Sequence, residues 1–146
     1  MKRGYAEIPE GQMHYRMEGE GEPVILLHMA VASGDEFVRP MHYISKYYRA
    51  IAPDFLSAGD SDPAPYPYTI ADHAETVIRF MDTMGIKKAH IVGHHLGATV
   101  GMEVQIAHSE RVNKLVLSGF GCSFLRIANP ITPKKLGSQM IWLPSC

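Results

Sequence analysis

Five residues, Gly93-His94-His95-Leu96-Gly97, have the types and spacing that could support nucleophilic chemistry. They match the Gly-x-Ser-x-Gly pattern of a nucleophile elbow, in which a strand turns sharply into a helix and presents the nucleophile at the corner. His95 occupies the position of the serine. Residues 88–92 have the pattern of a short buried strand, and residues 96–102 that of the start of a packed helix. The segment therefore predicts an elbow that carries an imidazole.

An imidazole at this corner could itself attack a carbonyl carbon. Neutral histidine needs no separate base, its reference pKa of about 6.5 leaves it mostly neutral near pH 7, and a helix N-terminus favours the neutral form further. We expect the corner to point the His95 ring into a cavity. The alternative is that His95 only fills space or forms hydrogen bonds in a pocket that no longer reacts. His94 is expected to be structural and to form local hydrogen bonds.

A metal site is a competing interpretation, because His28, His94 and His95 all lie near expected strand ends. Adjacent residues at an elbow point apart, however, and no cysteine or carboxylate has ligand spacing with these histidines. We therefore predict neither a metal nor a cofactor. Asp54, at the end of its strand, is expected to brace loops rather than to perform acid–base chemistry.

The elements that must position these residues alternate between short apolar strands and helix-length segments. This alternation indicates a mostly parallel sheet covered by helices. Continuous apolar runs are typical of strands that are buried on both faces. Strands are expected at an opening hairpin of residues 5–7 with 12–17, and at residues 24–27, 49–52, 88–92 and 114–117.

Three helices are expected to cover this sheet. Thr69 and Asp72 have the spacing of an N-terminal capping pair, and Gly85 is placed to end the same helix in the left-handed conformation. Gly97 and Gly101 would let the helix after the elbow approach the sheet closely. The remaining helix presents its apolar residues on one face, at Phe37, Met41, Ile44 and Tyr48.

Length, composition and charge limit the classes of protein to which the chain can belong. The 146 residues are enough for one domain with a single core, and 46% hydrophobic with 20% charged residues are globular values. A net charge of -1 gives no reason to expect nucleic acid or an anionic membrane as partner, so a small-molecule substrate or ligand is expected. No apolar run approaches the roughly 20 residues of a membrane span. Two cysteines and a start without an apolar leader favour the cytoplasm.

Taken in order, these motifs resemble the α/β-hydrolase superfamily over residues 5–119. Several segments at family spacing carry the resemblance, so it does not depend on the elbow alone. They are Leu26-Leu27-His28 followed by Met29-Ala30, the loop from Ala52 to Asp62 that contains Gly59-Asp60-Ser61-Asp62, the elbow, and the strand that ends at Ser118-Gly119.

The resemblance implies a fold, an activity and a set of site residues. The fold would be a mostly parallel sheet with helices on both faces, comprising the family's strands one to six and lacking strands seven and eight. The activity would be hydrolysis of small-molecule esters or related bonds. His95 would stand at the nucleophile position, and the backbone N–H groups of Leu96 and Ala30 would hold the oxyanion. His28, Met29 and His94 would line the pocket.

Three departures from the family pattern affect the predicted activity. Met29 stands where the family usually has glycine. The triad acid and histidine of the family follow later strands that do not fit into the 27 residues after Gly119, and no Asp or Glu occurs beyond Glu110. The isolated chain therefore lacks the acid and base of a triad. Two alternatives follow: a catalytically inactive relative that binds a small ligand or a protein, or a truncated product of a longer hydrolase.

The sequence predicts a division of the chain into a core and a C-terminal segment. Residues 1–119 would form the hydrolase core, and residues 120–146 a partial lid or an irregular C-terminal tail. Without further strands, residues 114–118 would form an exposed sheet edge, which is prone to aggregation unless the tail or another copy of the chain covers it. A homodimer across this edge is therefore expected.

Overall fold

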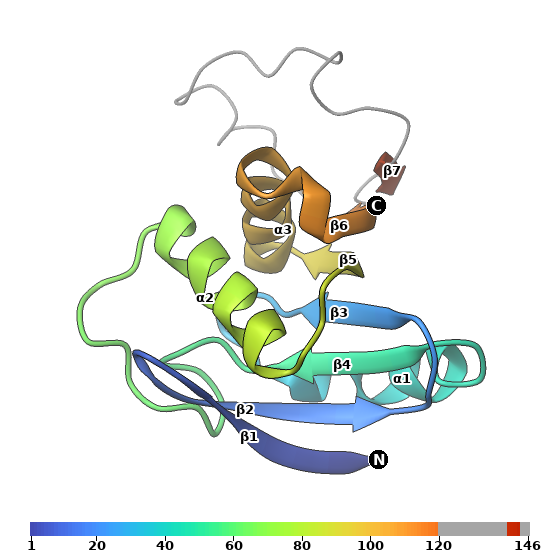
Figure 1. The fold of residues 1–146 in the computed structure, drawn as a ribbon, viewed down its shortest axis with the longest axis horizontal. Helices are drawn as coiled ribbons and strands as arrows, with labels where there is room; N and C mark the ends of the chain where they lie inside the picture. Colours follow the sequence, from blue (N-terminus) through green and yellow to red (C-terminus); the bar gives the residue numbers. More distant parts are fainter. Residues whose placement is uncertain (120–139, 144–146) are drawn as a thin grey trace.

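The structure is a computed structural model that describes residues 1–119 and 140–143. One sheet of seven strands organises it, in the order β1-β2-β4-β3-β5-β6-β7 (Figure 1). The first two strands form an antiparallel hairpin, β2 also pairs antiparallel with β4, and all other neighbours are parallel. The strands are β1 (Lys2–Ile8), β2 (Gly11–Glu18), β3 (Pro23–Leu27), β4 (Arg49–Pro53), β5 (Ala89–His94), β6 (Val112–Ser118) and β7 (Met140–Leu143).

Helices lie on both faces of this sheet, as predicted (Figure 1). Helix α2 begins with the expected capping box, in which the Thr69 hydroxyl accepts from the N–H of Asp72 and the Asp72 carboxylate accepts from the N–H of Thr69. Gly85 follows that helix with φ +67, the left-handed conformation predicted for it. The helical elements are η1 (Gly34–Phe37), α1 (Val38–Ile44), α2 (Ile70–Thr83), α3 (Leu96–Ala107) and η2 (Ser109–Arg111). None of the described helices has the length and hydropathy needed to cross a bilayer.

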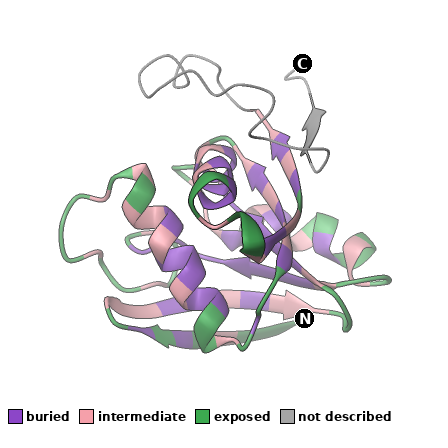
Figure 2. Cartoon of the chain, turned by 45° about the horizontal axis from the view of Figure 1, so that its top comes forward, coloured by how far each residue is buried: buried purple, intermediate pink, exposed green. Residues whose placement is uncertain are grey.

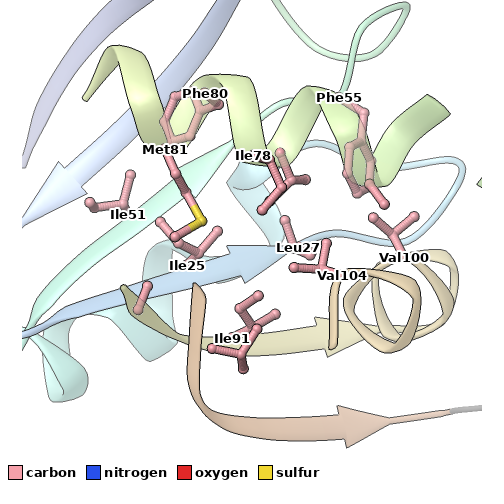
Figure 3. Close-up of a cluster of buried hydrophobic side chains, with 14 of the residues drawn as sticks. Ile25, Leu27, Ile51, Phe55, Ile78, Phe80, Met81, Ile91, Val100 and Val104 are labelled. Carbon is pink, nitrogen blue, oxygen red and sulfur yellow. The ribbon is translucent and has the colours of Figure 1, made fainter. Parts of the chain in front are cut away.

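The core has two layers, one on each side of the sheet. Helices α2 and α3 cover one face, where Met81 and Val104 pack with strand residues such as Ile25 and Ile91 (Figure 3). On the opposite face η1 and α1 contribute Phe37 and Met41, which pack on Val24, Leu26, Ala50 and Ala52. Successive strand residues point to opposite faces, so β3 is buried on both sides, and Figure 2 shows buried residues along the central strands.

Two expectations about the elements are corrected. The predicted helix through Tyr48 ends at Ile44, and Tyr48 lies in the following turn with 38% of its surface exposed. Strand β6 is not an open edge, because Val116 and Leu117 are in register with Ile141 and Trp142 of β7. The sheet therefore extends beyond the six strands expected. A dimer across residues 114–118 stays a prediction and would have to form on β7 or displace it. The rest of the predicted lid or tail, residues 120–139 and 144–146, lies outside the described residues.

Candidate active site

The sharp bend predicted at residues 93–97, here called the corner, is present. Strand β5 ends at His94 and helix α3 begins at Leu96. His95 between them has φ 54 and ψ -108, a conformation that side-chain-bearing residues rarely adopt. Such a backbone costs about 1–3 kcal/mol and persists only where surrounding packing enforces it. The backbone of the corner is therefore strained at His95.

Two glycines allow the corner to form. A Cβ atom on Gly97 would overlap the backbone carbonyl of Leu27 on β3, and one on Gly93 would overlap the backbone of Gly97. Two hydrogen bonds hold the bend: the N–H of Gly97 donates to the carbonyl of His28 at 3.1 Å, and that of His95 to the carbonyl of Ser118 at 2.9 Å. The close approach of α3 to the sheet thus depends on the absence of side chains at these positions.

The described residues do not enclose His95. His95 is exposed, and its ring lies edge-on to that of His94 with 6.4 Å between their centroids. Among described side chains, no carboxylate or hydroxyl hydrogen-bonds to it. A surface depression exists elsewhere, at the opposite ends of the parallel strands, where it is lined by Asp82, Gly85, Ile86, Lys87 and Arg111. The expected enclosure of His95 is therefore not provided by residues 1–119.

The two predicted oxyanion donors remain candidates. The N–H of Leu96 belongs to the first turn of α3, where no earlier helical carbonyl can accept it. The N–H of Ala30 lies in the loop after β3, and Ala30 is exposed. Within residues 1–119 neither N–H donates to another residue. Because the N-terminus of a helix also carries partial positive charge, this end of α3 favours an anion.

His94 forms a hydrogen bond with Glu36, a residue that no sequence motif had indicated. Its Nδ1 lies 2.6 Å from Glu36 Oε1, and the side chains of His94 and Glu36 are 40% and 18% exposed. The second oxygen of the same carboxylate accepts the N–H of Met29 at 3.1 Å. His94 thus forms a hydrogen bond, as expected, but the partner is 58 residues away in the chain and the bond is not local.

His28 holds together the loops after β3 and β4, and its place in the predicted pocket stays a prediction. It is fully buried. Nδ1 donates to the carbonyl of Met29 at 2.7 Å, and Nε2 accepts the N–H of Phe55 at 2.9 Å. Both nitrogens are therefore engaged in the neutral ring. Burial lowers the pKa of His28, although the bond to Met29 acts in the opposite direction.

The pKa of His73, on the first turn of α2, is also lowered by burial. Both histidines have an unfolded reference value of 6.5. Their folded pKa values lie below it, so the unfolded chain takes up protons first as the pH falls. We therefore expect the free energy of unfolding to be constant above about pH 7 and to decrease as the pH drops below 6.5. Urea unfolding from about pH 8 to about pH 5 measures this slope.

A His73→Phe variant is the matched control for this slope. The ring of His73 packs against Phe55 and Tyr68, and phenylalanine keeps that packing without a titratable group. The variant should show a shallower loss of stability between pH 6.5 and about pH 5. An identical slope in both proteins would contradict the contribution of His73, and a flat profile in the parent would contradict that of both histidines.

Asp54 braces loops, as predicted, and does so at the centre of a buried network. Its Oδ1 accepts the N–H of Gly34 at 2.7 Å and lies 3.3 Å from Arg16 Nη1; its Oδ2 accepts the N–H of Asp60 at 3.1 Å and lies 2.9 Å from His14 Nδ1. Burial raises the pKa of Asp54, but the bonds from Asp60, Gly34 and His14 and the charge of Arg16 lower it more, so the net shift is downward. Asp54 therefore stays ionised.

Three side chains of the same network have the atom types that bind metal ions. Ligand atoms of His14, Asp54 and Asp60 gather within 4.8 Å of one another. Arg16 already supplies a positive charge to Asp54, and both oxygens of Asp54 accept hydrogen bonds from the chain. The cluster is thus explained as a loop brace. The sequence signal for it was the placement of His14 and Arg16 on one side of β2, two residues apart.

Fold and site together define the class. The chain belongs to the alpha/beta hydrolase fold family, whose model matches residues 22–140. The resemblance inferred from the motifs is therefore confirmed, and so is the fold class.

Particular relatives are hydrolases of several kinds. The chain is 32% identical over 114 residues to a putative carbamate hydrolase RutD of Azorhizobium caulinodans, covering 77% of this chain and 43% of the relative. It is 30% identical over 108 residues to haloalkane dehalogenase 2 of Mycobacterium tuberculosis, covering 73% and 38%.

Solved structures that resemble this chain also include hydrolases. An N-acyl homoserine lactonase AidH superposes with a TM-score of 0.78 at 29% identity, over 82% of this chain and 45% of that one. A meta-cleavage product hydrolase, CumD of Pseudomonas fluorescens, has a TM-score of 0.75 at 34% identity, over 80% and 44%. The chain thus spans less than half the length of each of these relatives.

Proposed function

We propose that this chain carries the nucleophile-elbow half of a hydrolase that acts on small-molecule esters or related bonds. His95 would be the nucleophile, and the N–H groups of Leu96 and Ala30 would hold the oxyanion. The observation that carries the proposal is the strained, exposed position of His95, at φ 54 between β5 and the N-terminus of α3.

The chemistry can be written with this chain's own groups. The imidazole nitrogen of His95 attacks the ester carbonyl carbon, the carbonyl oxygen becomes an oxyanion, and the two N–H groups stabilise it. The C–O bond to the alkoxide then breaks, the proton on the other imidazole nitrogen passes to the alkoxide to give the alcohol, and water hydrolyses the acyl-imidazole to the carboxylic acid and free His95. The relatives are named for a carbamate, a haloalkane and a homoserine lactone, which supports a small molecule as substrate without selecting the bond.

The test is hydrolysis of p-nitrophenyl esters with a His95→Ala variant. Because the nucleophile is removed, kcat/KM should fall by about a hundredfold or more. Rapid quenching followed by mass spectrometry should find the acyl group on the peptide that contains His95 in the parent only.

A control separates the corner from general reactivity of surface imidazoles. His42 is an exposed histidine on α1, far from the corner in the chain, and His42→Ala should leave turnover unchanged. Equal activity in the His95→Ala variant and the parent would contradict the proposed mechanism.

A second candidate is a catalytically inactive relative that binds a small ligand or a protein. The observation in its favour is that no described carboxylate or hydroxyl contacts the ring of His95, so nothing within residues 1–119 orients or deprotonates it. Saturable ligand binding without turnover and without an acyl adduct would support this candidate. The truncated-product alternative predicts that a longer coding sequence supplies the acid and base.

A further inference from the structure

One carboxylate connects the two loops that carry the proposed oxyanion donors. Glu36 Oε2 accepts the N–H of Met29, at 3.1 Å, in the loop after β3. Glu36 Oε1 pairs with Nδ1 of His94, at 2.6 Å, on the last residue of β5. Met29 directly precedes Ala30, and His94 lies two residues before Leu96. Each contact therefore lies within two residues of one of the two donors.

The element that carries Glu36 is itself held in place. The side chain of Ser33 caps η1 by accepting the N–H of Asp35, and the N–H of Gly34 donates to Asp54 at 2.7 Å. Phe37, at the end of η1, is buried against the sheet. The carboxylate thus extends from a fixed base, and only 18% of the Glu36 side chain is exposed.

We infer that Glu36 is a positioning residue that sets the separation of the Ala30 and Leu96 N–H groups by bridging Met29 and His94. The inference rests on the proposed function for the role of these two N–H groups. The proposed role is geometric, because the carboxylate fixes the positions of two loops relative to each other. One carboxylate oxygen accepts the N–H of Met29 and the other pairs with His94, so Glu36 holds the loop after β3 and the corner at the same time.

A bridging role of Glu36 and a role of its negative charge alone predict different effects of substituting this residue. Glutamine has the same length, its carbonyl can accept the N–H of Met29, and its amide can donate to Nδ1 of His94. Aspartate keeps the charge but is one methylene shorter, so it cannot reach both partners. A bridging role therefore predicts that Glu36→Gln is close to the parent, Glu36→Asp is impaired, and Glu36→Ala is impaired most.

The first measurement does not depend on catalysis. In ¹⁵N-labelled protein, Glu36→Ala should displace the amide resonances of both Ala30 and Leu96 and should accelerate hydrogen exchange at Met29. Glu36→Gln should restore these signals. Glu20→Ala, an exposed carboxylate in the loop before β3, is the control and should change none of them. Unfolding curves identify any variant that fails to fold, and His94→Leu, which removes one arm of the bridge because leucine has no hydrogen-bonding group, then replaces Glu36→Ala.

The second measurement probes the anion site with butyrate, a carboxylate that presents an oxyanion. Glu36→Ala should weaken butyrate binding at Ala30 and Leu96 about tenfold, as expected for a misplaced hydrogen bond. With an ester substrate, kcat should fall while KM stays the same. If the parent shows no response to butyrate and no turnover, the proposed function fails, but the exchange at Met29 still tests the bridge. Equal effects of Glu36→Gln and Glu36→Ala, or unchanged Ala30 and Leu96 signals in Glu36→Ala, would overturn the inference.

Discussion

Replacing Asp54 by alanine is expected to lower the free energy of unfolding by about 3–5 kcal/mol, because a buried charge loses its partner. Asp54 is fully buried, and the side chain of Arg16, 3.3 Å away, is only 3% exposed. In the variant, the guanidinium would keep its surface contact with Asp35 and its 3.4 Å contact with His14 Nδ1, but no buried carboxylate. The N–H groups of Gly34 and Asp60 would also lose their acceptor. Urea unfolding followed by circular dichroism near pH 7 measures this loss.

The matched control is Asp35→Ala, which removes the other carboxylate that contacts Arg16. Asp35 lies 2.8 Å from the guanidinium but is 63% exposed, so the expected loss is below about 1 kcal/mol. The pKa of Asp54 is lowered from 3.8 on folding, so its contribution is complete above pH 3.8 and is lost as the pH falls through the folded value. Similar losses in the two variants would show that the buried network does not stabilise the loops.

Replacing Gly97 by alanine is expected to destabilise the protein by about 3 kcal/mol or more and to abolish any activity of the corner. The new methyl group would overlap the backbone carbonyl of Leu27, which cannot move without disturbing β3. Helix α3 must then shift away from the sheet and take His95 with it. Unfolding measurements give the loss of stability, and ester hydrolysis gives the loss of function.

Gly101→Ala provides the comparison within the same helix. A methyl group there would lie 3.1 Å from a side-chain atom of Ile91 and 3.2 Å from one of Leu115, and such side chains can adjust. The higher helix propensity of alanine, about 1 kcal/mol, offsets that crowding. We expect a change within about 1 kcal/mol for Gly101→Ala. If the two variants were equally stable, the close approach of α3 at Gly97 would not be a constraint.

Local patterns in the sequence determined the elements of this protein. Apolar runs located the parallel strands, and the capping pair of Thr69 with Asp72 located the start of α2. The glycines at 93 and 97 located the corner. These features depend on residues only a few positions apart, whose backbone preferences and side-chain periodicity act without the rest of the chain. For the same reason the ordered motifs were sufficient to assign the family.

Contacts between loops could not be predicted in this way. Nothing in the spacing of Glu36 and His94, 58 residues apart, indicates that they pair, and the same holds for Asp54 with His14, 40 residues apart. The pairing of β6 with β7 was missed because a four-residue strand has too weak a pattern to recognise.

The sequence by itself determined the class of fold, the position of the corner and the residue at its apex. Tertiary structure decided which side chains surround these features. The order β4-β3-β5 makes these strands neighbours, so the loops that follow them lie together at the carboxyl ends of the strands. Only there do Glu36, Met29 and His94 meet, and only there does His28 become buried between loops. Strand order is a property of the whole chain, since it depends on how distant apolar runs share one core.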